Sequence, residues 1–357
     1  ELAEVYSSVI LRDVSFANIS SESMADNVPN HLTALNKFTD KSLAPVDINS
    51  MIITGKTWNR GNCIGETVGP YISQYFYLDY QFGNLDITQK YTVELDPEPT
   101  PTLAHWLKVQ NGENPLSITV DANKQYVWNP RVLASVVHND PMYQFYYIAA
   151  LISFQNGISF AGITDTKSSA WTSTGPPDIL ASVAHVALGA LRVAWQAKYT
   201  HSLKIRPEVY AQRIDLIKSN PNDFADVPGF SNLKTLCDSY PEMLNLVKTN
   251  NNEQNWLINC LYPEMSPVHP SHPAGHAVVG WACCTVLKAM LDTHELNGDL
   301  KKWPIQPKHS INGNELVDYT HADKESMTIV GELNKLANNA GMGRNFAGIH
   351  FRADATY

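Results

Sequence analysis

Apolar residues form long runs from residue 141 onwards, and these runs predict helices. The segment 141–155 begins with proline and is apolar nearly all round, which is typical of a buried helix. The segment 177–199 also begins with proline, is rich in Ala and Leu, and contains no internal proline. Further helices are predicted to begin at Pro207 and to span 275–291 and 327–340.

The pattern over residues 1–130 is less regular and predicts a loop-rich part. One helix is predicted over 27–38. Between 84 and 128 the sequences DPEPTP and NGENP predict loops, because proline at this density interrupts regular elements. Short strands are predicted at 117–120 and 125–128. The chain is therefore predicted to be mainly α, a helical bundle with long loops and few short strands.

Composition narrows the class of protein further. The 357 residues, 44% of them hydrophobic, are enough for one domain over 1–357 with a sizeable core. The formal net charge of −9 and the lack of a basic stripe argue against a nucleic-acid partner. No uninterrupted apolar run reaches the roughly 18 residues that a membrane span requires, so no membrane span is predicted. The charged share of only 17% favours a surface that is partly covered in an oligomer.

The five cysteines show no metal-binding spacing. Cys283 and Cys284 lie inside an apolar helical run and are predicted to be buried free thiols. Cys237 and Cys260 flank a loop-rich stretch, and the sequence leaves a disulfide between them open.

Three segments concentrate cationic and imidazole side chains in an otherwise acidic chain. Lys198 ends a predicted helix, and Arg206 follows eight residues later, directly before Pro207. A turn with the sequence HPSHPAGH leads into the helix that begins at Gly275. Near the C-terminal end, Arg344 is followed six residues later by His350 and four residues after that by Asp354. The candidate residues of the three segments are Lys198, Arg206, His269, Gly275, His276, Arg344, His350 and Asp354.

Each of these residues alone has a commoner structural explanation. A Lys or Arg at a helix end is usually a solvated cap, and a lone His is usually a structural residue. Together, two guanidinium groups and an ammonium group offer the donors that suit a tetrahedral oxyanion. A helix N-terminus adds free backbone N–H groups. Two histidines add one group able to bond the central atom and one able to exchange protons.

The ordered set resembles the type 2 phosphatidic acid phosphatase superfamily, which includes acid phosphatases and vanadium haloperoxidases. The superfamily pattern runs Lys, a short gap, Arg-Pro, then Pro-Ser-Gly-His, then Arg-x5-His-x3-Asp. The spacing of Arg344, His350 and Asp354 matches it throughout. The eight-residue step from Lys198 to Arg206 is similar to that of marine algal bromoperoxidases, whereas phosphatases and fungal chloroperoxidases use a step one shorter. The sequences Leu11-Arg-Asp and Val137-His-Asn-Asp-Pro-Met-Tyr-Gln also resemble the algal group.

This resemblance implies a vanadium-dependent haloperoxidase. It would oxidise bromide or iodide with hydrogen peroxide and halogenate small organic substrates. The implied fold is the helical bundle of the vanadium haloperoxidase and acid phosphatase type, and the implied cofactor is vanadate, whose site phosphate can also occupy. The site would lie within residues 177–357, and its implied cofactor-binding residues are Lys198, Arg206, Ala274, Gly275, His276, Arg344 and His350.

The resemblance also implies individual roles. His350 would bond the metal, His276 would exchange protons, and Lys198 would polarise bound peroxide. Trp195 and His269 would shape the approach of halide. For Asp354 two readings stay open, because it lies one helical turn after His350. It either orients the His350 imidazole or forms an ion pair with Arg344 or Arg352.

One position departs from the family pattern. Ala274 stands where the family has serine, so one hydroxyl donor to the oxyanion is lost, typically at a cost of about 1.5–3 kcal/mol. A weakened vanadate- or phosphate-binding variant is therefore one alternative function. An acid phosphatase with His350 as nucleophile is another.

Two points concern the chain as a whole. The family continues with a further helix beyond the position of Asp354, and the sequence leaves open whether this protein continues past Tyr357. By resemblance to the algal enzymes we also expect a homo-oligomer that is extracellular, in the cell wall or periplasmic.

Overall fold

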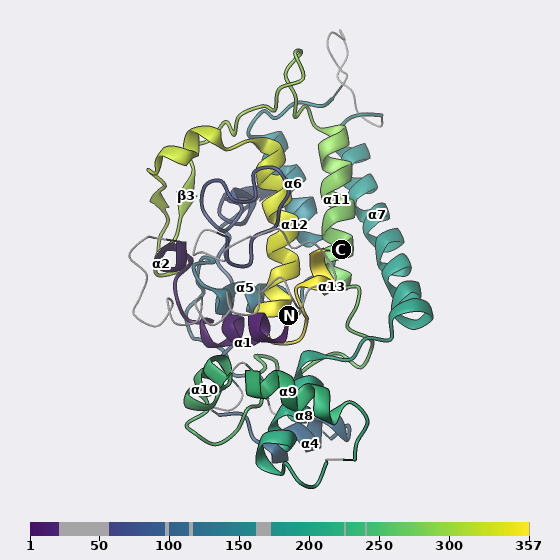
Figure 1. The fold of residues 1–357 in the computed structure, drawn as a ribbon. Coiled ribbons are helices and arrows are strands. Elements are labelled where there is room, and N and C mark those ends of the chain that lie inside the picture. The colour runs from purple at the N-terminus through teal and green to yellow at the C-terminus, as the bar shows by residue number, and fades with distance from the viewer. Residues whose placement is uncertain are drawn as a thin grey trace.

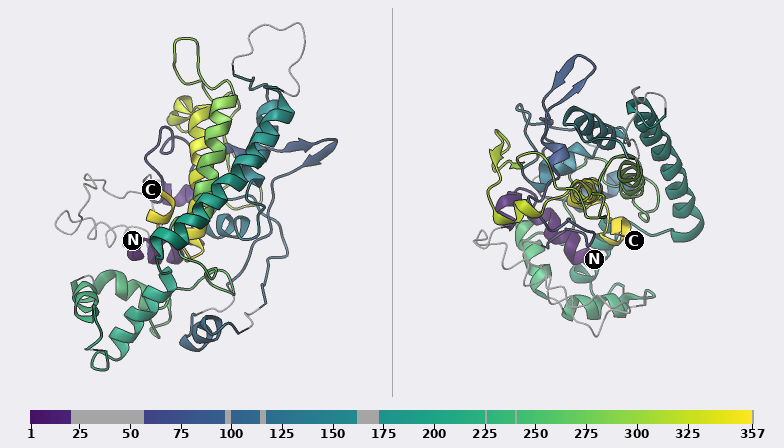
Figure 2. Two further views of the ribbon diagram at one scale, coloured as in Figure 1. Left: turned by 90° about the vertical axis from the view of Figure 1, so that its right-hand side faces the viewer. Right: turned by 90° about the horizontal axis from the view of Figure 1, so that it is seen from above.

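A computed structural model describes the protein over residues 1–20, 57–96, 100–113, 117–161, 173–224, 226–239 and 241–356. The helices of its bundle include α6 (Gln144–Gln155), α7 (Pro176–Ala197), α11 (Gly275–Met290) and α12 (Ile329–Phe346). Figure 1 shows these helices running side by side along the molecule. Helix α11 packs against both α7 and α12, with α7 on the outside (Figure 2). The protein is thus a mainly helical bundle, as the sequence predicted.

Helix α12 is the centre of the bundle, and all of its residues are buried. It is nevertheless rich in polar side chains, several of which form hydrogen bonds with neighbouring loops. The Lys335 Nζ atom donates to the carbonyl oxygens of Val68 and Pro70 at 2.9 and 3.2 Å and lies 2.6 Å from a Glu332 oxygen. Such pairing is needed because an unpaired buried charge is costly. The result is a fixed central helix that carries Arg344 in its last turn.

Prolines position several helix starts, as the sequence suggested. Helix α7 has two prolines at its first positions and Asp178 in its first turn, where the helix dipole favours a negative charge. Helix α8 (Pro207–Ser219) begins directly after Arg206. The predicted helix over 327–340 is longer than expected and continues to Phe346. The predicted helix over 27–38 lies outside the described residues.

The remaining helices are short and surround the ends of the bundle. In Figure 1, α8, α9 and α10 lie together below the long helices, with α4 also at that end of the molecule, while α13 lies beside α11 and α12. The short elements are α1 (Leu2–Ile10), α2 (Phe16–Ser20), α4 (Leu103–Gln110), α5 (Pro130–Val136), α9 (Phe230–Ser239), α10 (Pro241–Asn250), α13 (Ala353–Thr356), η2 (Gln74–Phe76), η3 (Lys198–Ser202) and η4 (Ala322–Ser326).

Helix α4 corrects the prediction that residues 84–128 form only loops and short strands. It fits between Pro101 and Gly112, and the Thr102 side chain accepts a hydrogen bond from the His105 N–H at 3.2 Å. This N-cap starts a helix within the proline-rich stretch. The prolines limited its length without preventing it.

The strand predictions at 117–120 and 125–128 were wrong. The structure forms two antiparallel pairs elsewhere, β1 (Tyr80–Phe82) with β2 (Leu85–Ile87) and β3 (Lys308–His309) with β4 (Val317–Asp318). The predicted segments make only isolated bridges, Glu94 to Val120 and Tyr91 to Gln125. The Glu94 N–H donates instead to the Ser135 hydroxyl of α5 at 2.8 Å, which interrupts a ladder at this point.

Cys237 and Cys260 are both buried free thiols, so the disulfide that the sequence left open is absent. The Cys260 sulfur instead donates to the Gly348 carbonyl at 3.7 Å. Cys283 and Cys284 are buried and free, as predicted.

By length and composition alone, one helical stretch, 176–219, would suffice to cross a membrane. Core helices pass the same test, so this is weak support for a membrane span. The stretch includes α7, which packs against α11 on one side and exposes the other.

Candidate functional site

Lys198 lies where α7 ends in the π-helical turn η3, and its side chain is buried. The Nζ atom donates to the carbonyl oxygens of Pro270 and Ser271 at 2.6 and 3.1 Å. Single π-turns are frequent at functional sites because they redirect one side chain out of the regular helix. The end of α7 is thereby joined to the loop that leads into α11.

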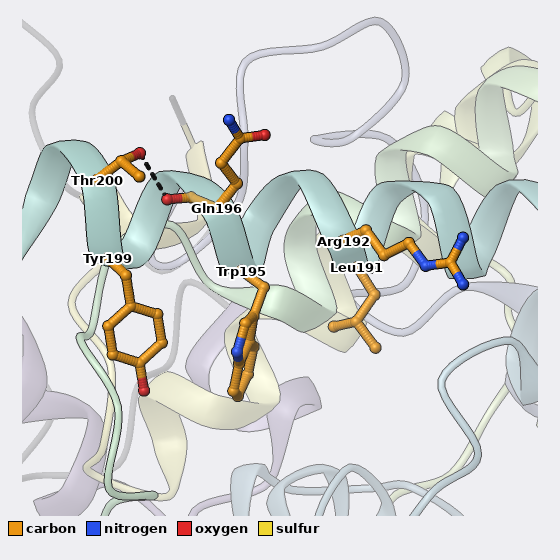
Figure 3. Close-up of a pocket in the computed structure, with 6 residues that line it drawn as sticks. All are labelled: Leu191, Arg192, Trp195, Gln196, Tyr199 and Thr200. Atoms are coloured by element: carbon orange, nitrogen blue, oxygen red, sulfur yellow. Dashed lines mark hydrogen bonds between the residues drawn. The ribbon is translucent and has the colours of Figure 1, made fainter.

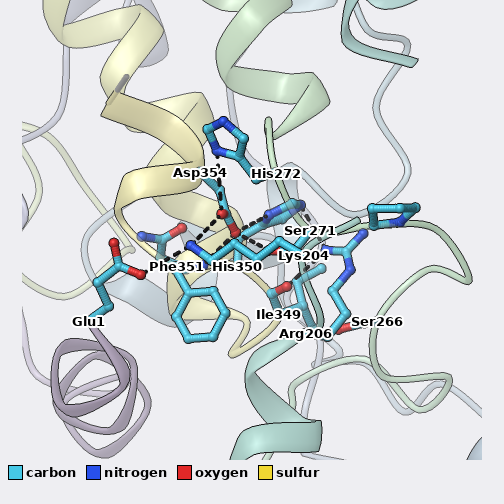
Figure 4. A network of polar contacts seen from close by, with 12 residues as sticks. Glu1, Lys204, Arg206, Ser266, Ser271, His272, Ile349, His350, Phe351 and Asp354 are labelled. Atoms are coloured by element: carbon cyan, nitrogen blue, oxygen red, sulfur yellow. Dashed lines mark hydrogen bonds and ion pairs between the residues drawn. The ribbon is translucent and has the colours of Figure 1, made fainter. Parts of the chain in front are cut away.

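Arg206 connects all three cation-bearing segments. It is the N-cap of α8 and has the extended backbone that a residue before proline prefers. Its Nε donates to the His269 carbonyl at 3.0 Å, and its Nη1 donates to the Ile349 carbonyl at 2.9 Å. The same Nη1 lies 2.9 Å from His350 Nε2, and Nη2 lies 3.0 Å from His269 Nδ1 (Figure 4).

His350 is held in one orientation by Asp354. The His350 Nδ1 atom lies 3.0 Å from Asp354 Oδ2. Because the carboxylate can only accept and the guanidinium can only donate, we assign the proton to Nδ1 and a lone pair to Nε2. Burial and the neighbouring Arg206 lower the pKa of His350 well below its usual value, so the neutral form is favoured. The structure thus places Asp354 against His350, whereas Arg344 bonds to Val137 and Arg352 to Glu4.

Asp354 has further partners that the sequence did not suggest. Its carboxylate accepts from the Ser271 hydroxyl, from the Phe351 N–H at 2.9 Å and from Lys204 Nζ at 3.0 Å (Figure 4). Although burial opposes ionisation, the bonds with His350 and Ser271 lower the pKa of Asp354. A fully ionised, saturated carboxylate is suited to fixing the imidazole tautomer.

Arg344 projects from the last turn of α12 and is buried. Its Nη1 donates to the Val137 carbonyl at 2.9 Å, and its guanidinium carbon lies 5.0 Å from the centre of the Tyr262 ring. Among the described residues, its Nε has no hydrogen-bond partner. A buried donor without a partner is unusual and indicates a group that is missing from its surroundings.

The N-terminus of α11 provides the backbone part of the site. Ala274 is the N-cap, is fully buried, and makes no side-chain cap, while its N–H donates to the Asp354 carbonyl at 2.7 Å. The first N–H groups of α11, beginning with Gly275, have no partner within the helix. His276 lies in the first turn, and its Nε2 is 2.8 Å from Asp140 Oδ1. Within the described part of the chain, His276 makes no hydrogen bond to the other predicted site residues.

The electrostatics of the cluster point to a bound anion. Burial and the neighbouring Arg206 lower the pKa of Lys198 to about 7, and burial lowers that of Arg206 to about 10 with a contribution from Arg344. The nearby carboxylate of Asp354 is already used by His350, Lys204 and Ser271. Among the described residues, Lys198, Arg206 and Arg344 form no direct ion pair with a carboxylate, and Arg344 Nε has no hydrogen-bond partner. Together with a helix N-terminus, these cations fit a tetrahedral oxyanion.

The same residues do not form a conventional metal-cation site. Across the described ranges, no group of three His, Cys, Asp or Glu side chains could hold a metal ion. Vanadate would fit this donor set. The cationic side chains would donate to its oxygens, and His350 Nε2, which accepts from Arg206 Nη1 in this structure, is the nitrogen that would bond the central atom in its place.

Trp195 and His269 lie at the outer edge of the cluster. Their ring centres are 4.7 Å apart, and burial and Arg206 lower the pKa of His269 to about 4. Trp195 is 46% exposed and belongs to an apolar pocket on the outer face of the helix (Figure 3). The residues lining this pocket are Leu191, Arg192, Trp195, Gln196, Tyr199 and Thr200.

Sequence reasoning missed several residues that support the cluster. Ser271 and Lys204 both hold Asp354, and the Asp140 side chain and Val137 carbonyl hold His276 and Arg344. In the sequence, the segment of Val137 and Asp140 is marked only by its resemblance to algal enzymes. Ser271 lies inside the HPSHP turn, but its partner Asp354 is 83 positions away in the sequence. The signal that could have found it is a hydroxyl side chain within a segment that already held candidate residues.

The fold and the site together define a helical-bundle protein with a buried cluster of Lys, Arg and His side chains. The family model described as the VCPO second helical-bundle domain matches residues 178–357, half of the chain. This chain therefore belongs to the family of vanadium haloperoxidase-like proteins.

Individual relatives agree with this assignment. A vanadium-dependent bromoperoxidase of Ascophyllum nodosum is 28% identical over 363 residues, which cover 99% of this chain and 64% of that protein. One from Corallina pilulifera is 25% identical over 409 residues, with 99% and 67% covered. The homohexameric structure of the second vanadate-dependent bromoperoxidase of Ascophyllum nodosum matches with a TM-score of 0.85 and 26% identity, covering 99% of this chain and 61% of that one. This chain thus spans about two thirds of the length of its relatives.

Proposed function

We propose that this protein is a vanadium-dependent haloperoxidase that oxidises bromide or iodide with hydrogen peroxide. The observation that carries the proposal is the buried group of Lys198, Arg206 and Arg344 around the lone pair of His350 Nε2. The family membership and the named bromoperoxidase relatives support it.

In the proposed oxyanion site, both side chains and the backbone would bind the anion. Lys198, Arg206, Arg344 and the Gly275 N–H would hold the oxygens of vanadate, and His350 Nε2 would bond the vanadium. When bound, vanadate supplies a Lewis acid that activates peroxide toward halide. Donors fixed before the reaction stabilise developing charge without having to reorganise, which is the main contribution that such a site makes.

His276 is the proposed proton-exchanging residue. Its Nε2 faces Asp140 Oδ1 at 2.8 Å, so Asp140 accepts the Nε2 proton and Nδ1 is the atom left to take or give a proton. Its ring is partly exposed, with a side-chain exposure of 15%, which allows exchange with water. Trp195 and His269, at the outer edge, are proposed to shape the path of halide.

We further propose that the chain forms a homo-oligomer and acts outside the cytoplasm, as an extracellular, cell-wall or periplasmic protein. The homohexameric state of the structural neighbour supports assembly. So do apolar side chains on and after the outer face of α7, where Leu188, Val193 and Leu203 are 49%, 63% and 65% exposed. Light scattering after gel filtration would measure the mass directly, and a monomer at micromolar concentration would contradict assembly.

The activity is tested by bromination of a phenol-type dye with peroxide, with and without added vanadate. We expect turnover that requires vanadate, bromide or iodide, and peroxide. His350→Ala should abolish it, while His201→Ala, an exposed histidine in η3, should not. Hydrolysis of p-nitrophenyl phosphate without any bromination would show a phosphatase instead. Vanadate binding with neither reaction would show a weakened anion-binding variant.

A further inference from the structure

The segment 137–140 begins the connection between α5 and α6 and contacts two residues of the candidate site. The Val137 carbonyl accepts from Arg344 Nη1 at 2.9 Å, and Asp140 Oδ1 lies 2.8 Å from His276 Nε2. Two residues of the oxyanion cluster therefore depend on where this short segment lies. The supporting residues Val137 and Asp140 lie outside the three cation-bearing segments.

His138 stands between these two contact points and is itself clamped by two carboxylates. Its Nδ1 lies 2.7 Å from Glu94 Oε1, and its Nε2 lies 2.6 Å from Glu264 Oε1. The side chain of His138 is only 5% exposed. Glu94 is itself fixed, because its backbone N–H donates to the Ser135 hydroxyl in α5.

The two short contacts determine the charge state of the ring. A neutral imidazole has one N–H donor and one lone pair, whereas an ionised carboxylate can only accept. A neutral ring would therefore set a lone pair against a carboxylate oxygen on one side. The imidazolium form donates on both sides, and each charge-assisted bond is about twice as strong as a neutral one.

Tyr262 links this clamp to the cluster a second time. The His138 and Tyr262 rings stack at a centre distance of 3.7 Å and an angle of 5°. The Tyr262 hydroxyl donates to the Ala134 carbonyl in α5, and the Arg344 guanidinium lies 5.0 Å from the same ring. A change at His138 therefore reaches Arg344 through both Tyr262 and Val137.

We propose that His138, held as an imidazolium between Glu94 and Glu264, is a positioning residue that fixes the 137–140 segment and so orients His276 and Arg344 for the oxyanion. This inference rests on the proposed vanadate-binding function and deepens it, because it adds a positioning residue outside the groups that are proposed to bind the anion. The charged and titratable groups that face this arrangement are Glu94, Glu264, Tyr262 and Arg344, with Asp140 next along the chain.

The pH dependence follows from the direction of the pKa shift. Although burial opposes it, the hydrogen bonds to Glu264 and Glu94 raise the pKa of His138 to about 9. The stabilisation from the clamp is therefore fully present below the ordinary histidine pKa and is lost as the pH rises through about 9. Anion binding should weaken over the same interval.

The first test replaces the clamped ring. His138→Asn cannot donate toward both carboxylates in the same geometry, and we expect the dissociation constant for orthovanadate at pH 7 to rise by about tenfold or more, as for other residues that orient ligands. His185→Asn, at an exposed histidine of α7, is the matched control and should bind vanadate as the unmodified protein does. Calorimetry measures both constants without requiring turnover.

The second test keeps the ring and changes its partner. In Glu264→Gln the amide can accept from the imidazolium or donate to a neutral Nε2, so the clamp survives deprotonation of His138. We expect this variant to bind vanadate with near-normal affinity at pH 7 and to lose the extra weakening that the unmodified protein shows near pH 9. Lys198 is common to both proteins, so its own titration cancels in the comparison.

The third measurement distinguishes failure of this inference from failure of the proposed function. Nitrogen NMR of the His138 ring should show both nitrogens protonated at pH 7, with a midpoint near 9. If the protein binds phosphate but not vanadate, the haloperoxidase proposal fails, and the same variants are then compared with inorganic phosphate as the probe. A neutral His138 ring at pH 7, or unchanged anion affinity in folded His138→Asn, overturns the positioning role.

Discussion

Restoring a hydroxyl at position 274 is the change whose consequences the structure specifies most fully. Ala274 is fully buried, is the N-cap of α11, and lies between the Asp354 carbonyl and the Gly275 N–H. Ala274→Ser adds one oxygen atom there. At an N-cap position that oxygen accepts from the N–H two or three residues later, and its own proton remains available for an anion.

The two interactions have separate magnitudes. The cap should raise the free energy of unfolding of the empty protein by about 1 kcal/mol, or roughly 2 °C in melting temperature for a chain of this length. The bond to a charged oxygen is worth about 1.5–3 kcal/mol, which corresponds to vanadate binding tighter by roughly ten- to a hundredfold. Only the second effect requires an anion.

Thermal unfolding without ligand and calorimetric titration with orthovanadate separate these effects. Ala277→Ser is the matched control, because it adds a hydroxyl to a buried position of the same helix but past the cap. We expect no gain in affinity from it. If Ala274→Ser folds normally and binds vanadate no more tightly than the unmodified protein, the oxyanion does not lie at the N-terminus of α11, and this part of the reasoning is refuted.

Three further predictions concern other parts of the molecule. Asp354→Asn should weaken vanadate binding by roughly 10–100-fold, measured by calorimetry, because the amide can no longer hold the His350 tautomer; unchanged affinity would show that Arg206 alone orients the ring. Because burial and Arg206 lower the pKa of Lys198 to about 7, its side-chain amine is largely unprotonated at pH 8. Anion binding at pH 8 should therefore take up about one proton in the unmodified protein but not in Lys198→Met. Calorimetry in buffers of different ionisation enthalpy measures this uptake, and equal uptake in both proteins would contradict the prediction. Gly65→Ala should lower the free energy of unfolding by about 2 kcal/mol in denaturant titration, since φ is +81° and an added Cβ would lie 2.5 Å from Gly331 Cα; a neutral effect would mean that the loop moves freely away from α12.

The long helices were predictable because their signals are local. Proline at the first positions, apolar periodicity and the absence of interior breakers identified α7, α8 and α11 within a few residues. The spacing of Lys198, Arg206 and His350 likewise lies along the sequence, and the structure brings these residues into one cluster.

The supporting contacts were not predictable, because most of them use the backbone or depend on packing. Lys198 bonds to two carbonyl groups, and Arg344 to a third, so no side-chain pattern marks the partner. The clamp on His138 joins residues 44 and 126 positions apart. The predicted strands failed for a related reason, since a hydroxyl from α5 took the N–H that a ladder would have used. The extent of one domain over 1–357 stays a prediction.

The wide sequence separation of the site contacts has a consequence for folding. Arg206 reaches partners 63 and 144 positions away, and Arg344 reaches one 207 positions away. Contacts of such range close large loops and are therefore among the last to become favourable as a chain folds. An oxyanion can bind only after α5, α8 and α12 have docked, and at a hundred times its dissociation constant it would add about 2.7 kcal/mol to the stability of the completed bundle. The cofactor would thus select fully assembled molecules.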